Sequence, residues 1–331
     1  MDYRTIDKEN QSLLKEILKS PQAYRRAKEK YENPEDVIPA HFVFGSAVDH
    51  LTTEDTPIEN NFYIMGESAI SDTIKKIVDH VHEEIAGWKD KLEDCSEAIV
   101  RSCSFEQYGQ ALKEDTRIKK VVETGSGYYA DLLACAGKTI ISQEDYTKAV
   151  NCNNALRNDD FTGQYFNPGE NQQLLKKVVI QFTYHDVEMK CELDLVFIDH
   201  DTKQIYPIDI KTIGTSVYAF KGSFWKYRYD FQAAVYFYAC LGEYYELLEK
   251  GYKLMPFRFL VVEKENYNPP LIFTTSEEIL NIGMNGGTNS DCKYYEGFEQ
   301  AIDRYKYHIE NNTWDYPMEY LENQGQIIIS V

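Results

Sequence analysis

The sequence has 331 residues, and its hydrophobic fraction of 43% excludes wholesale disorder. Its formal net charge of −19 at pH 7 argues against a protein that coats DNA generally, because phosphate binding normally requires a basic surface. Residues 171–240 differ from the rest, since they hold eight Lys or Arg against eight Asp or Glu and are therefore neutral.

Location and redox state follow from what the sequence lacks. No run approaches the roughly 20 apolar residues that span a bilayer, and the first residues have no signal-peptide core. We therefore expect a cytoplasmic protein with no membrane contact. The seven cysteines include no CxxC pair, which predicts reduced thiols and neither a zinc ribbon nor an iron–sulfur cluster.

The N-terminal part should be mainly helical. Apolar residues at helical spacing mark a first helix around residues 13–18, and Ser20 followed by Pro21 marks the start of a second. Further helices are expected over residues 42–52 and 71–85.

A stretch rich in Asn, Asp, Gly and Gln at residues 151–173 predicts a surface loop and a domain boundary. Beyond it we expect both strands and helices. The expected strands are 178–184, 188–198, 204–212 and 257–262, and the expected helices are 229–250, 277–284 and 293–311. We therefore expect a helical region over residues 1–170, a core over 171–265 and a C-terminal extension over 266–331 that packs on the core.

Two of these strands form a predicted hairpin that carries charged residues. Side chains alternate between the two faces of a strand. If residues 200–203 form the loop, Asp199 pairs with Gln204, and Asp194 then faces Asp209.

Two carboxylates in directly opposed positions have Cβ atoms about 5 Å apart and repel each other. A Mg²⁺ ion bound by Asp194 and Asp209, with Lys211 beside it, would compensate this repulsion. Such an ion polarises a phosphate and lowers the pKa of a bound water. The alternative is a solvated face with an ordinary salt bridge. The apolar residues on both sides of the acidic positions argue against it, since they predict a mostly buried hairpin.

The hairpin and the helix after it resemble the PD-(D/E)XK nuclease superfamily, in particular its RecB-like and RecE-like exonuclease branch. The sequence KCELD, which ends at Asp194, resembles the metal-binding strand, and Asp209-Ile210-Lys211 resembles the (D/E)xK strand. Gln232 and Tyr236 match the QxxxY helix that follows. The resemblance implies that Asp194, Asp209 and Ile210 bind metal.

Two upstream segments extend the resemblance. Residues 20–24, SPQAY, resemble a segment common in that branch, and residues 44–50, FGSAVDH, resemble its GxxxH helix. The histidine position of the family is Asp49 here, and His50 follows it. We favour Asp49 as a metal ligand, and His50 stays the alternative.

The contacts with DNA are expected around the QxxxY helix. Gln232 and Tyr236 are four residues apart and share a helix face that would border the active site. Lys221, Lys226 and Arg228 alternate with aromatic residues and are expected to contact phosphates, although the aromatic residues suit a core equally well.

The resemblance implies a restriction-endonuclease-like α/β core, a small mixed sheet flanked by helices, with an N-terminal helical region and a C-terminal helical extension. It implies hydrolysis of DNA that depends on Mg²⁺ or Mn²⁺, by a 5′ to 3′ exonuclease acting on double-stranded ends in phage-type recombination. It further implies a single-strand annealing protein as partner and a homo-oligomeric ring.

Other functions remain open. The chain could be an endonuclease of the same superfamily, or a catalytically silent DNA-binding or inhibitor protein with a nuclease-like fold. The intact set of Asp194, Asp209 and Lys211 argues against a silent protein. A nuclease with an iron–sulfur cluster needs clustered cysteines, and Cys240 and Cys292 are too sparse.

Overall fold

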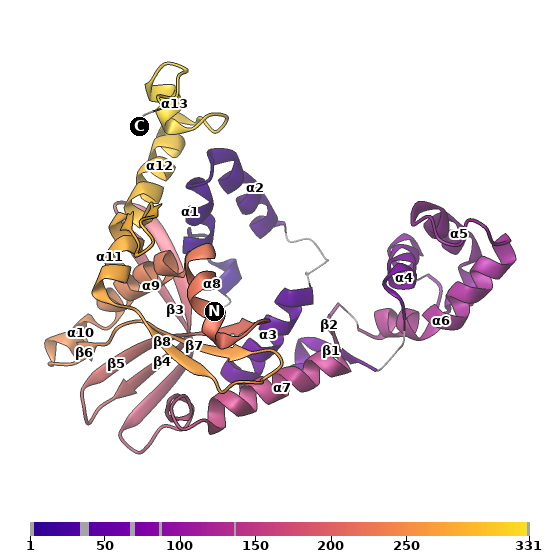
Figure 1. Cartoon of the computed structure of the whole chain (residues 1–331), viewed down its shortest axis with the longest axis horizontal. Coiled ribbons are helices and arrows are strands. Elements are labelled where there is room, and N and C mark those ends of the chain that lie inside the picture. The colour runs from indigo at the N-terminus through magenta and orange to yellow at the C-terminus, as the bar shows by residue number, and fades with distance from the viewer. Residues whose placement is uncertain (1–2, 34–39, 67–69, 86–87, 136, 330–331) are drawn as a thin grey trace. The chain divides into compact units, whose positions relative to one another are not determined.

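The computed structural model describes every residue except 1–2, 34–39, 67–69, 86–87, 136 and 330–331. The chain forms two compact units (Figure 1). The sheet unit comprises Met1–Ile38, Val48–Asp55 and Lys148–Val331, and the helical unit comprises Pro39–Ala47 and Thr56–Thr147. The division into three regions at residues 170 and 265 stays a prediction.

A six-stranded mixed sheet forms the centre of the sheet unit, with the strand order β3-β4-β5-β7-β8 and with β6 paired to β5. The strands are β3 (Gln172–Tyr184), β4 (Val187–Asp199), β5 (Gln204–Ile213), β6 (Lys253–Leu254), β7 (Arg258–Glu263) and β8 (Leu271–Thr274). Neighbours are antiparallel except for the parallel partners β6 and β7 of β5. This small mixed sheet flanked by helices confirms the expected fold class.

The parallel pairing of β5 and β7 requires a crossover, and helices supply it. They are η5 (Val217–Ala219), α8 (Phe220–Lys226), α9 (Tyr229–Glu243) and α10 (Tyr245–Glu249). Helix α9 packs on β3, β4 and β5, and its residues Phe231, Val235 and Ala239, four apart, are all buried. The crossover also carries Gln232, whose side chain reaches Asp209 of β5.

The remaining elements of the sheet unit lie before and after the sheet in the sequence. The earlier ones are η1 (Tyr3–Thr5), α1 (Gln11–Ile17), α2 (Pro21–Glu32), the second half of α3 (Ala40–Thr53), α7 (Gln143–Asn158) from Lys148 onward and η4 (Gly163–Tyr165). Ser20 accepts a hydrogen bond from Ala23 N and Pro21 is the first residue of α2, as the sequence predicted.

The C-terminal elements are α11 (Glu277–Asn285), β9 (Gly287–Thr288), β10 (Tyr294–Tyr295), α12 (Phe298–Asn311) and α13 (Met318–Glu322). Helix α11 packs on α9 at Gly283, where a Cβ atom would lie 2.1 Å from the carbonyl oxygen of Asp230. Only glycine permits this close approach, which fixes the C-terminal helices against the core.

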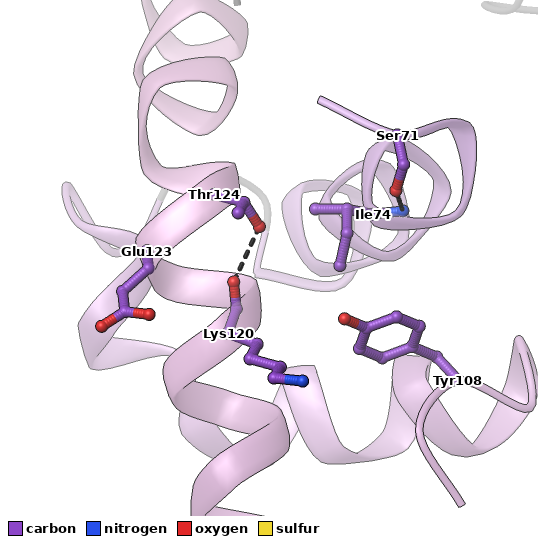
Figure 2. A pocket seen from close by; sticks show the side chains of 6 residues that line it. All are labelled: Ser71, Ile74, Tyr108, Lys120, Glu123 and Thr124. Atoms are coloured by element: carbon purple, nitrogen blue, oxygen red, sulfur yellow. Dashed lines mark hydrogen bonds between the residues drawn. The ribbon is translucent and has the colours of Figure 1, made fainter. Parts of the chain in front are cut away.

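The helical unit has its own buried core. It contains η2 (Ile58–Asn60), β1 (Phe62–Met65), α4 (Asp72–Ile85), η3 (Leu92–Asp94), α5 (Ser96–Phe105), α6 (Glu114–Ala134) and β2 (Thr139–Ser142). Figure 2 shows a pocket between its helices, lined in part by Ser71, Lys120 and Thr124. Thr124 Oγ1 donates to Lys120 O at 2.7 Å and Ser71 Oγ accepts from Ile74 N. Both hydroxyls therefore form hydrogen bonds with backbone groups of the helix that they belong to or precede.

Three element predictions were wrong in extent. The helix expected over 229–250 is interrupted at Tyr244, where α9 ends and α10 begins. The helix expected over 293–311 begins only at Phe298, after the short strand β10. The loop expected over 151–173 contains the end of α7, which continues to Asn158.

Two expectations from composition can also be compared with the structure. All seven cysteines are free, as expected. Within the ranges that the structure describes, no helix combines the length and the apolar character needed to cross a membrane.

Candidate active site

The hairpin of β4 and β5 has the predicted register. Asp199 pairs with Gln204, and the pairing continues to Leu195 and Ile208. The next position in the same register places Asp194 opposite Asp209. There Asp194 Oδ2 accepts a 2.7 Å hydrogen bond from Ile210 N, so the strands separate and the carboxylate of Asp194 takes the place of a backbone partner.

Asp209 is the buried carboxylate of the site, with 4% of its surface exposed. Its Oδ1 accepts a 2.6 Å hydrogen bond from Gln232 Nε2, and Lys211 Nζ lies 2.6 Å from its Oδ2. Among the described residues Oδ2 receives no hydrogen bond, so the approach of Lys211 is a charge contact without hydrogen-bond geometry. Burial raises the pKa of Asp209 to about 6; Lys211 opposes this shift and Asp194 adds to it.

Lys211 follows Asp209 on the same face of β5. Its ammonium lies 4.9 Å from the centre of the Tyr229 ring. Burial favours the neutral lysine, but Asp209, Tyr229 and Asp194 outweigh burial and raise the pKa of Lys211. Lys211 is therefore a protonated, positioned cation beside a buried carboxylate.

A second group of charges lies beside the hairpin. Lys177 Nζ on β3 donates to both carboxylate oxygens of Asp49, at 2.7 and 2.6 Å, and lies 3.4 Å from Asp194 Oδ1 and 3.6 Å from Glu192 Oε1. We call Asp49, Glu192 and Asp194 the acidic cluster. Burial and the charge of Asp194 raise the pKa of Asp49 to about 6, although Lys177 opposes the shift.

Lys177 is the residue that sequence reasoning missed. The register of β3 and β4 places it opposite Asp194, and that register was the only signal in the sequence that could have found it. His50 is buried, with 5% of its surface exposed, whereas Asp49 makes the contacts that form the acidic cluster.

The QxxxY residues have different surroundings. Gln232 contacts Asp209 directly. Tyr236 is buried against Phe257, with ring centres 6.0 Å apart, and burial raises its pKa well above the usual range. The predicted roles of both residues in catalysis stay predictions.

The three predicted DNA-binding cations also differ. Lys221 and Lys226 are exposed, and Lys226 Nζ lies 5.1 Å from the centre of the Tyr227 ring. The guanidinium of Arg228 donates to both carboxylate oxygens of the fully buried Asp230 and to Glu296 O. Contact of these three residues with DNA stays a prediction, and Arg228 has a structural role beside it.

The donor set of the site fits a hard divalent cation. Asp49, Asp194 and Asp209 have carboxylate oxygens and the carbonyl oxygen of Ile210 would be the fourth predicted ligand; both kinds of oxygen are ligands that Mg²⁺ accepts. The buried Asp209 Oδ2 receives no hydrogen bond, although Lys211 Nζ lies 2.6 Å from it, and burial together with the charge of Asp194 raises the pKa values of Asp49 and Asp209. In the part of the chain that the structure describes, no three His, Cys, Asp or Glu side chains are already gathered as a metal site. The residue types therefore suit Mg²⁺, but their side chains are not arranged as a preformed metal site.

Comparison with known proteins identifies the family. The model of a family described as "PDDEXK-like domain of unknown function (DUF3799)" matches residues 10–291, which include the acidic cluster, the hairpin and helix α9. A search of curated proteins finds no match. A crystal structure from Eubacterium rectale described as "Putative exonuclease" aligns over 89% of this chain and 96% of its own, at 12% identity and a TM-score of 0.36, values too low to support an argument. The chain belongs to this family of PDDEXK-like domains, within the PD-(D/E)XK nuclease superfamily.

Proposed function

We propose that this protein is a metal-dependent nuclease that hydrolyses the phosphodiester bonds of DNA. The observation that carries the proposal is the buried carboxylate of Asp209, held by Gln232 and Lys211 at the position opposite Asp194. A carboxylate in such surroundings costs free energy unless its charge is used or neutralised.

Asp194, Asp209, the carbonyl of Ile210 and Asp49 would hold the metal, Mg²⁺ or Mn²⁺. A divalent ion bound there supplies Lewis-acid polarisation of a phosphate oxygen and a water of lowered pKa. His50, beside Asp49 but buried, is the second choice for the ligand on α3.

The protein's own groups position the reactants and stabilise charge. Lys211, kept protonated by Asp209, is placed to neutralise the negative charge that develops on the phosphate. Gln232 fixes the orientation of Asp209 through a direct hydrogen bond. Lys221 and Lys226 are exposed and would contact the backbone of the DNA.

The finer activity rests on the resemblance of the motifs to the RecE-like and RecB-like branch. We infer a 5′ to 3′ exonuclease that acts on double-stranded ends in phage-type recombination, beside a single-strand annealing protein and as a homo-oligomeric ring.

One assay tests the proposal. The protein is incubated with linear duplexes labelled at the 5′ or 3′ end, with closed circular duplex and with an RNA duplex, in Mg²⁺, Mn²⁺ or EDTA. We expect metal-dependent release of the 5′ label from linear DNA alone. Cleavage of the circle would identify an endonuclease. Binding of DNA without cleavage in any metal would identify a silent protein.

A further inference from the structure

Lys177 lies among three carboxylates at the edge of the hairpin. Its ammonium holds both oxygens of Asp49 and lies within 4 Å of Asp194 and Glu192. Two of these partners, Asp49 and Asp194, belong to the metal ligands proposed above. Lys177 and a divalent cation would therefore need the same oxygen atoms.

The backbone of β3 is adapted to this position. Pairing with β4 is regular on both sides, at Lys176 with Leu195 and at Val178 with Leu193, but it is interrupted where Lys177 faces Asp194. Lys177 has φ +49°, a left-handed conformation that is unfavourable for a residue with a side chain. Such a conformation inside a strand persists only where surrounding contacts hold it, and at Lys177 the ammonium contacts Asp49 and Asp194.

Neighbouring Lys176 of the same strand forms a surface salt bridge and serves as a comparison for Lys177. Its ammonium lies 2.5 Å from the carboxylate of Asp55, whose side chain is 86% exposed. The partners of Lys177 are less exposed, at 37% for Asp49, 27% for Glu192 and 16% for Asp194, so the charge of Lys177 acts where water screens it less. Loss of Lys177 would leave three close carboxylates with less compensation than the loss of Lys176 would leave.

We propose that Lys177 is a resident counter-ion of the acidic cluster, which competes with the divalent cation for Asp49 and Asp194 and thereby weakens metal binding. This inference rests on the proposed function, because it requires the metal site. The ammonium neutralises part of the cluster when no metal is bound, and a cation enters only by displacing it from these two ligands. An ordinary structural salt bridge makes the opposite prediction, since its loss would disorder the ligands and weaken metal binding.

The test measures metal affinity directly. Mn²⁺ is titrated calorimetrically into the wild type, Lys177→Met and the matched control Lys176→Met, and each protein is melted in EDTA and in Mn²⁺. We expect the Kd for Mn²⁺ to fall about ten-fold or more in Lys177→Met and to stay within about two-fold in Lys176→Met. In EDTA, Lys177→Met should melt below the wild type, and its shift on addition of Mn²⁺ should be the larger one.

The possible results separate the two proposals. An unchanged or higher Kd in Lys177→Met, while the wild type binds Mn²⁺, overturns the role of Lys177 and leaves the metal site standing. Absence of Mn²⁺ binding in the wild type overturns the metal site itself. If Lys177→Met does not fold, Lys177→Gly replaces it, because glycine adopts the left-handed conformation without strain and equally lacks the charge. Its Kd is expected to fall in the same way, and a Kd equal to that of the wild type rejects the inference.

Discussion

Gln232 Nε2 donates a 2.6 Å hydrogen bond to Asp209 Oδ1, and this contact connects helix α9 to strand β5 across 23 positions of the sequence. Both side chains are almost fully buried. The amide therefore determines which way the carboxylate of Asp209 points, and it stabilises the charged form of that carboxylate.

Replacement of Gln232 by leucine should lower cleavage without unfolding the protein. The variant places an apolar side chain of similar size in the buried position, but it removes the hydrogen bond that favours the ionised Asp209. We expect activity to fall about 10-fold or more at pH 7 and the acidic limb of the pH–rate profile to move to higher pH. A profile with an unchanged acidic limb would show that Gln232 does not act through Asp209.

Loss of either member of the Asp209 and Lys211 pair should be severe. We expect Asp209→Asn and Lys211→Ala each to reduce cleavage of end-labelled duplex at least ~100-fold, because removal of one preorganised electrostatic group typically costs that much. Circular dichroism checks that the fold is intact. Turnover near the wild-type rate in either folded variant would remove the hairpin from the mechanism.

Lys226→Ala and Arg228→Ala should have different effects. Lys226 is exposed, so its loss should raise KM for DNA and reduce the salt dependence by about one released counterion. Loss of Arg228 leaves the fully buried Asp230 without its ion-pair partner, which should destabilise the fold by about 3–5 kcal/mol. Chemical denaturation and salt titrations of KM separate the two. Equal stability of both variants would show that the pair with Asp230 is weak.

The parts of the site that follow from strand periodicity could be predicted from the sequence. The side chains of β4 and β5 alternate, and the loop at residues 200–203 fixes which residues pair, so the opposition of Asp194 and Asp209 needed no long-range information. The contact of Gln232 with Asp209 was expected only in outline, from the shared helix face of Gln232 and Tyr236.

The contacts of Lys177 could be found only in part in this way. The register of β3 and β4 places Lys177 opposite Asp194, but its partner Asp49 is 128 residues away, and Lys177 lies just before the strand expected over residues 178–184. The structural contact of Arg228 was also missing from the sequence-based prediction. Its left-handed backbone, φ +60°, accompanies a pair with Asp230 two residues along the chain, and its contact with DNA stays a prediction.

Asp49→Ala should weaken the dependence on metal more than His50→Ala does. Asp49 belongs to the acidic cluster with Asp194, whereas His50 is buried beside it. We expect a higher concentration of Mg²⁺ for half-maximal cleavage in Asp49→Ala, and a nearly unchanged one in His50→Ala. The reverse order would assign the ligand on α3 to His50.

The stability of Asp209→Asn should depend on pH in a defined direction. The pKa of Asp209 is about 6 in the folded protein, above the ordinary value of an aspartate, so the folded state binds more protons than the unfolded chain between about pH 4 and pH 6. The contribution of Asp209 to the free energy of unfolding therefore falls as pH rises through this window, and the asparagine variant lacks this fall.

In EDTA, the free energy of unfolding of the variant, relative to that of the wild type, should rise by on the order of 2 kcal/mol between pH 4 and pH 7. The variant should melt no lower than the wild type at pH 7. The pKa of Asp209 already includes the attraction of Lys211, which stays charged at both pH values, so the loss of this ion pair is part of the expected difference. Denaturation of both proteins at the two pH values measures the difference, and a constant difference would mean that Asp209 titrates normally.

The response to metal completes this prediction, because the free energy that the buried charge costs without metal should be recovered when a cation binds. At about 100 times its Kd, Mn²⁺ should stabilise the wild type by roughly 2.7 kcal/mol through mass action. Asp209→Asn lacks one of the proposed ligands, so its gain at the same Mn²⁺ concentration should be much smaller.

Asp199→Asn is a matched control, since Asp199 lies at the far end of the same hairpin, where its carboxylate accepts hydrogen bonds from the backbone N–H groups of the loop. That variant should show the full shift of the wild type. Thermal melts in EDTA and in Mn²⁺ give all three values, and an equal shift in Asp209→Asn and the wild type would mean that Asp209 is not a ligand.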